Sequence, residues 1–226
     1  MDIRKDLVDL HHMFHHFGWT DQIFTHISAR IPNTDTILMK PFSLFFDEVS
    51  IDNLVEINIH DVTNNSSNDI NEPGWNIHSA IHLAREDVIF VAHAHTTEIV
   101  AVSSTQSGLV SMSQYSDFVR HDIRRHSYEG VVFEEDEKPR IVNSLGSSKC
   151  MLMDNHGSIV VAPDAKRLLF RQFMLQRACE VQCIANMRDV KTIGNTRAPD
   201  HRTRLNNPPS SELLWNAVKR RIENGN

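Results

Sequence analysis

Apolar residues recur every three or four positions in the first stretch of the chain, residues 2–17. This stripe consists of Ile3, Leu7, Leu10, Phe14 and Phe17. The spacing predicts an amphipathic helix, and Gly18 is its expected end. The other faces carry four histidines, His11, His12, His15 and His16. We interpret them as solvated polar groups, with weak metal chelation by the i,i+4 pair of His12 and His16 as the alternative.

Shorter apolar runs follow and predict strands. They cover residues 27–31, 36–39 and 55–59. Residues 61–71, rich in Asn, Ser and Asp, predict a loop. The next apolar positions are spaced for a helix over 75–85, which leads into a buried strand over 88–95 and then a short helix and turn over 97–111. A helix followed closely by a buried strand is typical of a layered α/β domain.

The remainder of the chain is dominated by one long predicted helix, residues 164–187. A polar connector with three prolines, residues 191–211, separates it from a terminal helix at 212–223. A chain of 226 residues with 40% hydrophobic composition can bury a sizeable core. We therefore expect a single domain over residues 1–226, with its core at about 4–187.

Two histidines, His93 and His95, stand at the end of the predicted strand 88–95. Successive side chains of a strand point to opposite faces, so residues two apart project to the same side. Two imidazoles in this arrangement can hold one cation. The alternative is an ordinary pair of polar residues, which is the commoner meaning of this spacing by itself.

A third ligand has to come from another segment, and His156 is the best candidate. Apolar runs flank Asn155-His156-Gly157, a pattern that predicts a hairpin or tight connection, and Gly157 is able to take a positive φ there. Three neutral imidazoles with an open position form a catalytic type of metal site. His78 and His82 share one face of the predicted helix, and we interpret them as polar groups of the core or partners of the ligands.

Composition narrows the classes of function. The net charge of -6, from 23 basic and 29 acidic residues, gives no basic field for nucleic acid or an anionic membrane. No apolar run approaches the roughly 20 residues that cross a bilayer, and the N-terminus lacks a secretory apolar core. We expect a cytoplasmic protein with a small-molecule substrate. Cys150, Cys179 and Cys183 are predicted to be reduced, and the last two suit buried positions on a helix better than a disulfide.

Several motifs together resemble the class II aldolase/adducin-head superfamily, in order and in spacing. They are Phe17-Gly18-Trp19-Thr20-Asp21, His26-Ile27-Ser28-Ala29-Arg30, Ile77-His78-Ser79-Ala80-Ile81-His82, Val91-Ala92-His93-Ala94-His95-Thr96, Asn155-His156-Gly157 and Arg177-Ala178-Cys179-Glu180-Val181-Gln182. The resemblance runs from about residue 4 to residue 185 and is strongest for the adducin-like bacterial branch. It implies a three-layer α/β/α sandwich with a mixed or mostly antiparallel central sheet.

The resemblance also implies a divalent metal on His93, His95 and His156, and commonly a fourfold-symmetric tetramer with active sites at subunit boundaries. Zinc is the expected cofactor, while Fe²⁺, Mn²⁺, Co²⁺ and Ni²⁺ stay open because three imidazoles do not distinguish them. We expect a homotetramer. The apolar positions of the terminal helix, 213–222, would then pack on the same subunit or on a neighbour.

The chain departs from this family at the expected substrate site. Sugar-phosphate aldolases of the superfamily have a metal-binding, catalytic glutamate four residues before the position of His78, where this chain has Gly74. Glu72 lies two positions earlier, and a turn at Pro73-Gly74 would decide whether it reaches the metal. The pairs that hold phosphate in those aldolases match Thr25-His26, Phe42-Ser43 and Glu72-Pro73 here. These replacements remove donors and add anionic repulsion, so a phosphorylated sugar is not the expected substrate.

The expected function is a divalent-metal-dependent lyase that uses aldol cleavage or related enolate chemistry on a small non-phosphorylated carbonyl or hydroxy-acid substrate. The candidates for proton transfer are Glu72, Tyr115, His126 and Tyr128. Two alternatives stay open: a non-heme iron, oxygen-dependent decarboxylase or oxygenase, and a non-catalytic assembly module like the adducin head. Three imidazoles at metal-binding spacing argue against a pure scaffold, because unpaired buried imidazoles cost stability.

Overall fold

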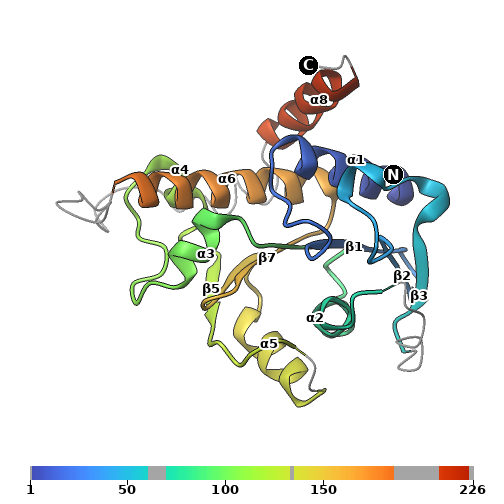
Figure 1. Ribbon diagram of the computed structural model, residues 1–226, viewed down its shortest axis with the longest axis horizontal. Helices are drawn as coiled ribbons and strands as arrows, with labels where there is room; N and C mark the ends of the chain where they lie inside the picture. The colour runs from blue at the N-terminus through green and yellow to red at the C-terminus, as the bar shows by residue number, and fades with distance from the viewer. Residues whose placement is uncertain (1, 61–69, 133–134, 186–208, 224–226) are drawn as a thin grey trace.

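The computed structural model describes residues 2–60, 70–132, 135–185 and 209–223, which form an α/β/α sandwich (Figure 1). The strands of its central sheet are β1 (His26–Arg30), β2 (Thr36–Met39), β3 (Val55–Asn58), β4 (Phe90–Ala94), β5 (Ile123–His126), β6 (Cys150–Met153) and β7 (Gly157–Ala162). The α-helices are α1 (Ile3–His16), α2 (Glu72–Ala84), α3 (Thr97–Ser103), α4 (Gln114–Val119), α5 (Lys138–Leu145), α6 (Ala165–Ile184) and α8 (Pro209–Glu223). Short 3-10 turns lie at Phe46–Glu48, Ile51–Asn53 and Glu135–Glu137. Most of the predicted loop 61–71 and connector 191–211 lies outside the described residues.

The sheet has the strand order β3-β2-β1-β4-β7-β6-β5. Neighbouring strands are antiparallel except β5 and β6, which are parallel. This confirms the expected mixed, mostly antiparallel sheet. The central strand β4 places His93 opposite His26 of β1 on one side and opposite Ile159 of β7 on the other. His93 therefore lies in the middle of the sheet, and it is buried.

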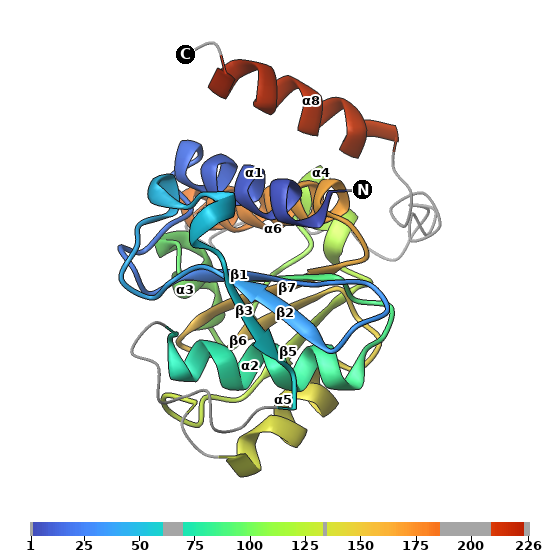
Figure 2. The ribbon, with the colours of Figure 1, turned by 90° about the vertical axis from the view of Figure 1, so that its right-hand side faces the viewer.

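Alternation along the strands gives each face of the sheet its own apolar core. Phe90 and Ala92 of β4 pack with the layer that contains α1 and α6, whereas Val91 packs with Ile77 of α2. His93 has the same parity as Val91 and therefore points to the α2 side. Figure 2 shows α1 and α6 on one side of the sheet and α2 and α5 on the other.

Helix α2 begins at Glu72, three residues earlier than the apolar spacing predicts. The Asn71 side chain caps it by accepting a hydrogen bond from the Gly74 N–H. Pro73 lies in the first turn, where its missing N–H has no partner to lose. The expected turn at Pro73-Gly74 is therefore the first turn of α2. The helix that begins there orients His78 toward β1.

Helix α1 confirms the predicted amphipathic helix, with one correction at His11. Its ring is fully buried, Nδ1 donates to the Leu7 carbonyl oxygen at 2.8 Å, and it meets Phe46 edge-on with centroids 4.7 Å apart. Burial lowers the pKa of His11 to about 3. His11 is therefore a neutral core residue rather than a solvated one, because its position on the helix lies within the packed face.

The terminal helix α8 packs on its own chain, against α1 and α6. Trp215 and Val218 are buried there, and Lys219 forms an ion pair with Asp9 at 2.7 Å. Leu213 lies outside this contact and is 70% exposed. Within the described ranges, no helix has both the length and the apolar character that crossing a membrane requires.

The three cysteines are free, as expected, but not all are buried. Cys150 and Cys179 are buried, and burial raises the pKa of the Cys150 thiol to about 12. Cys183 is exposed near the end of α6, so its predicted buried position is wrong. Although it shares a face of the helix with Cys179, it lies in the last turn of α6, where the chain no longer covers it.

Candidate metal centre and active site

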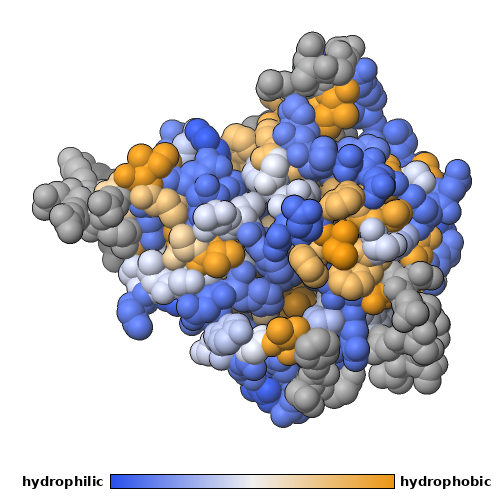
Figure 3. Space-filling view, in the orientation of Figure 1, coloured by the Kyte–Doolittle hydropathy of each residue, from blue (hydrophilic) through white to orange (hydrophobic). Residues whose placement is uncertain are grey.

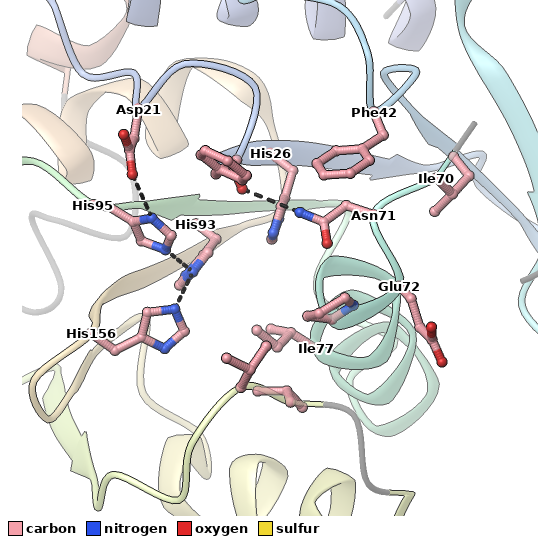
Figure 4. A pocket seen from close by; sticks show the side chains of 14 residues that line it. Asp21, His26, Phe42, Ile70, Asn71, Glu72, Ile77, His93, His95 and His156 are labelled. Atoms are coloured by element: carbon pink, nitrogen blue, oxygen red, sulfur yellow. Dashed lines mark hydrogen bonds and ion pairs between the residues drawn. The ribbon is translucent and has the colours of Figure 1, made fainter. Parts of the chain in front are cut away.

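His93, His95 and His156 converge at the end of β4. The Nε2 atoms of His93 and His95 are 2.6 Å apart, and those of His93 and His156 are 3.2 Å apart. One ligand nitrogen from each residue lies within 4.8 Å of the others. Figure 4 shows the three rings turned toward a common point. The structure therefore brings together the three predicted metal ligands.

Hydrogen bonds behind two of the rings fix which nitrogen faces the cluster. Nδ1 of His93 donates to the Ser158 carbonyl oxygen at 2.9 Å, and Nδ1 of His95 donates to Oδ2 of Asp21 at 3.2 Å. The Nε2 atoms of these neutral rings therefore both carry lone pairs that face each other. A shared cation converts this repulsion into attraction. Among the described residues, the second ring nitrogen of His156 has no partner of this kind.

Burial keeps the three imidazoles in the neutral form that binds metals. It lowers the pKa of His93 well below its ordinary value and lowers the pKa of His156 to about 4. Burial also lowers the pKa of His95, while its hydrogen bond with Asp21 acts in the opposite direction. The donor set of three neutral imidazoles fits zinc or another first-row divalent metal, so the triad can hold such an ion.

Residues 154–156, between β6 and β7, present His156 to the cluster. Asn155, with a φ of 57°, takes the left-handed conformation in this turn, and Gly157 does not use the positive φ that a glycine allows. Gly157 serves a different purpose, because a Cβ atom there would lie 2.5 Å from the Ala94 carbonyl oxygen. The missing side chain lets the hairpin pack tightly against the end of β4, which is the packing that brings His156 to the other two histidines.

A second polar group lies between β1 and α2, beside the triad. His26 and Ser28 project from one face of β1, and His78 and His82 lie one turn apart on α2. Nδ1 of His26 is 2.8 Å from Nε2 of His78. Oγ of Ser28 lies 2.5 Å from Nδ1 of His78 and 2.8 Å from Nε2 of His82. All four side chains are buried, so the predicted role of His78 and His82 as polar groups of the core is confirmed.

A cavity of ≈ 610 Å³ opens in front of the triad. Asp21 and the four imidazoles of His26, His93, His95 and His156 form its polar side. Its apolar walls come from Phe24, Phe42, Ile70, Ile77, Val131 and Val132. In the space-filling view, apolar residues border a recess near the centre of this face (Figure 3). The cavity has the size and the mixed lining typical of a small-molecule site.

The four residues predicted to transfer protons do not gather around the triad. Glu72 lines the cavity, but its carboxylate points away from the three histidines (Figure 4). Tyr115 on α4 packs against Arg177, with the guanidinium carbon 5.6 Å from the ring centre. Tyr128 is 58% exposed. Neither tyrosine is among the described residues that line the cavity.

His126 does not line the cavity either. It is buried at the end of β5, with Nδ1 2.9 Å from Oγ of Ser144 and Nε2 3.6 Å from a Glu137 carboxylate oxygen. Its position outside the cavity does not suit direct proton transfer to a substrate there.

Sequence reasoning gave no role of their own to two residues of the cavity, Asp21 and His26. Asp21 was part of a motif that carries the family resemblance, and His26 was named within such a motif and in the pair Thr25-His26 at an expected phosphate-binding place. One sequence signal could have indicated His26. It forms a polar i,i+2 pair with Ser28 on a strand, and His78 and His82 form a polar i,i+4 pair on a helix. Two such pairs can meet face to face, because both spacings place their residues on one side of the element.

Residues 5–183 match the family model described as the class II aldolase and adducin N-terminal domain. The chain belongs to this family. A provisionally named aldolase class 2 protein of Pseudomonas aeruginosa is 40% identical over 183 residues, which cover 80% of this chain and 71% of that protein. Alpha-adducin of Mus musculus is 32% identical over 190 residues, which cover 82% of this chain but 25% of the adducin.

The fold agrees with this membership. The crystal structure of an aldolase II superfamily protein from Pseudomonas syringae matches with a TM-score of 0.89 and 31% sequence identity, and the match covers 99% of this chain and 93% of that one. The class II aldolase-like fold expected from the sequence is therefore confirmed.

Proposed function

We propose that this protein is a divalent-metal-dependent lyase that acts beside the carbonyl group of a small, non-phosphorylated hydroxy-carbonyl or hydroxy-acid substrate. The observation that carries the proposal is the convergence of three neutral imidazoles on the wall of a cavity of ≈ 610 Å³. A divalent cation held there supplies a Lewis acid that polarises a carbonyl oxygen and stabilises an enolate. Zinc is the metal we propose.

Hydrogen bonds behind the triad support this chemistry by fixing two of the ligands. The Ser158 backbone carbonyl and the Asp21 carboxylate hold His93 and His95 in the tautomer that presents Nε2 to the cavity. Such partners behind the ligands orient the rings and raise their basicity. The apolar walls give the site a lining of low polarity, which strengthens electrostatic interactions within it.

The lining of the cavity also supports a substrate without a phosphate group. Phe42, Glu72 and Pro73, which stand at the expected phosphate-binding places, all line the cavity. Among its described lining residues there is no lysine or arginine to pair with a dianion. A phosphate group would therefore meet apolar surface and the Glu72 carboxylate, which disfavours its binding.

Two other functions stay open, an iron-dependent decarboxylase or oxygenase and a non-catalytic assembly module. The iron-dependent enzyme differs from a lyase by its requirement for dioxygen, because the chemistry of the three ligands alone does not separate the two. The similarity to alpha-adducin favours the assembly module as a second candidate. A scaffold gains nothing from three converging imidazoles, two of them with facing lone pairs, and the cluster therefore favours an enzyme.

Metal content is the decisive test. Protein purified without added metal should contain one divalent ion per chain, identified by elemental analysis, and His93→Ala and His156→Ala should each lose it. His15→Ala is a matched control, because this histidine lies on exposed α1 surface. Retention of full metal stoichiometry by both ligand variants would contradict the assignment. Product release from hydroxy-carbonyl and hydroxy-acid panels, measured in air and under argon, then separates a lyase from an oxygen-dependent enzyme.

A further inference from the structure

His26 is an imidazole that lines the cavity but lies outside the triad. Its Nδ1 is hydrogen-bonded to His78, away from the cavity. Its ring stacks on that of His93, with centroids 5.0 Å apart and planes 24° apart. It is not a member of the cluster whose ligand nitrogens lie within 4.8 Å of one another. Figure 4 shows the ring pointing into the cavity beside the triad. His26 is therefore a neighbour of the metal site with one nitrogen available.

Gly74 provides the room for this ring. A Cβ atom built at Gly74 would lie 2.6 Å from Nε2 of His26 and 2.7 Å from its Cδ2. Contacts this short do not occur in folded proteins, so a side chain at 74 and the imidazole of His26 exclude each other. The imidazole of His26 on β1 therefore fits because the facing residue in the first turn of α2, Gly74, has no side chain.

The buried chain of hydrogen bonds behind His26 holds the ring in place. It runs from Nδ1 of His26 through His78 and Ser28 to His82. A ring flip would exchange Nδ1 for a carbon and leave His78 without its partner, which is costly in a buried position. The orientation that directs Nε2 to the cavity is therefore preorganised before any ligand binds.

We propose that His26 recognises the substrate, through a hydrogen bond between Nε2 and a hydroxyl group on the carbon next to the metal-bound carbonyl or carboxylate. This inference rests on the proposed function and narrows its substrate class to 2-hydroxy carbonyl compounds and 2-hydroxy acids. A hydroxyl group both donates and accepts hydrogen bonds, so it can pair with Nε2 of His26 whether or not this nitrogen carries the proton. The apolar walls accommodate the remainder of the substrate.

Calorimetric titration of the zinc-loaded protein with glycolate and with acetate tests the inference. Wild type should prefer glycolate, the 2-hydroxy acid. His26→Leu should lose about three- to tenfold in glycolate affinity, the usual effect of one hydrogen bond, with acetate binding unchanged. Its zinc content and the visible spectrum of its Co²⁺ form should match wild type. Gly74→Ala, which displaces the ring without removing it, should act in the same direction, and His15→Leu is the control.

The possible results separate the two proposals. A zinc-loaded His26→Leu or Gly74→Ala protein that still prefers glycolate as wild type does would overturn the role of His26 and leave the lyase proposal standing. Loss of zinc from His26→Leu would make His26 a metal ligand and also overturn it. A wild-type protein that takes up no zinc, or that shows no preference for glycolate, would refute the metal-dependent hydroxy-acid function and the role of His26 together.

Discussion

The Asp21 carboxylate lies 3.2 Å from Nδ1 of His95, so a residue that precedes the first strand orients a ligand just after the central strand β4. Asp21→Ala should leave His95 free to rotate and should lower metal affinity by about 10- to 100-fold, the usual effect of removing such a partner. Competition with a chromophoric chelator measures the change. Asp47→Ala, an exposed carboxylate near His15, is the control. Equal affinity in both variants would show that Asp21 has no part in the site.

The contact between Gly74 and His26 predicts that Gly74→Ala changes the stability of the protein in opposite directions with and without the His26 imidazole, which a double-mutant cycle measures. In the wild-type background, Gly74→Ala should destabilise the protein by about 1–3 kcal/mol, because the new methyl group meets the imidazole. In the His26→Ala background the same change should stabilise by roughly 0.5–1 kcal/mol, since alanine favours a helix over glycine. Denaturant unfolding of the four proteins gives the coupling. Equal effects in both backgrounds would contradict the steric argument.

The lining of the cavity predicts discrimination against phosphate esters. Thermal-shift titration with a sugar phosphate and with its dephosphorylated analogue should give the larger stabilisation for the analogue, because Phe42 and Glu72 offer no donors to a dianion. Glu72→Gln should reduce this difference by removing one negative charge. Strong stabilisation by the phosphorylated compound alone would show that the substrate class is wrong.

Much of the fold follows from the sequence because its periodicities are strong. The alternation in 88–95 places His93 on the α2 face, and the hairpin around His156 brings the third imidazole from a different part of the chain. Both outcomes depend on local geometry and on a buried sheet with one register. The position of these ligands was therefore predictable without tertiary information.

The remaining site residues depend on contacts that local patterns do not encode. Asp21 meets His95 across 74 positions, and Glu72 turns away from the triad because Asn71 and Pro73 start α2 there. The role of Gly157 was missed for the same reason. A side chain at Gly157 has no room because the Ala94 carbonyl oxygen lies against it, and this is a tertiary contact. The local sequence indicated only a turn at this position. His11 was misjudged because helix α1 buries more than its apolar stripe.

Burial of His11 predicts a pH dependence of stability. Its pKa falls from 6.5 to about 3 in the folded protein. Between these values the unfolded chain binds a proton that the folded chain does not, so the free energy of unfolding decreases as the pH falls below 6.5. The slope for this group approaches about 1.4 kcal/mol per pH unit. His11→Leu should therefore flatten the dependence, measured by urea unfolding between pH 4 and pH 7, roughly the interval that separates the two pKa values.

The control for this effect is His15→Leu, since His15 lies on the same helix with about half of its side chain exposed, 52%. Its unfolding curves should show the slope of the wild type. If His11→Leu also retains that slope, then other buried groups account for the acid sensitivity. His82 is the next candidate, because burial lowers its pKa to about 3 as well.

The last prediction concerns assembly, and we propose a homotetramer whose subunit boundaries lie near the active sites. Large apolar side chains stay exposed on the single chain both beside the cavity and on α8. Phe24 and Val131 at the cavity are 50% and 57% exposed, and Leu213 on α8 is 70% exposed. Exposed apolar groups next to a functional site are typical of a surface that a partner covers.

Helix α8 allows the contributions of folding and assembly to be separated. Trp215 is buried on its own chain, so Trp215→Ala should destabilise the subunit by about 3–5 kcal/mol. Leu213→Ser removes only an exposed apolar group and should weaken assembly while leaving the unfolding of the subunit nearly unchanged. Deletion of residues 212–226 should reduce both assembly and activity. Light scattering at low micromolar concentration measures the mass of each protein, and a stable wild-type monomer there would refute the proposal of shared sites.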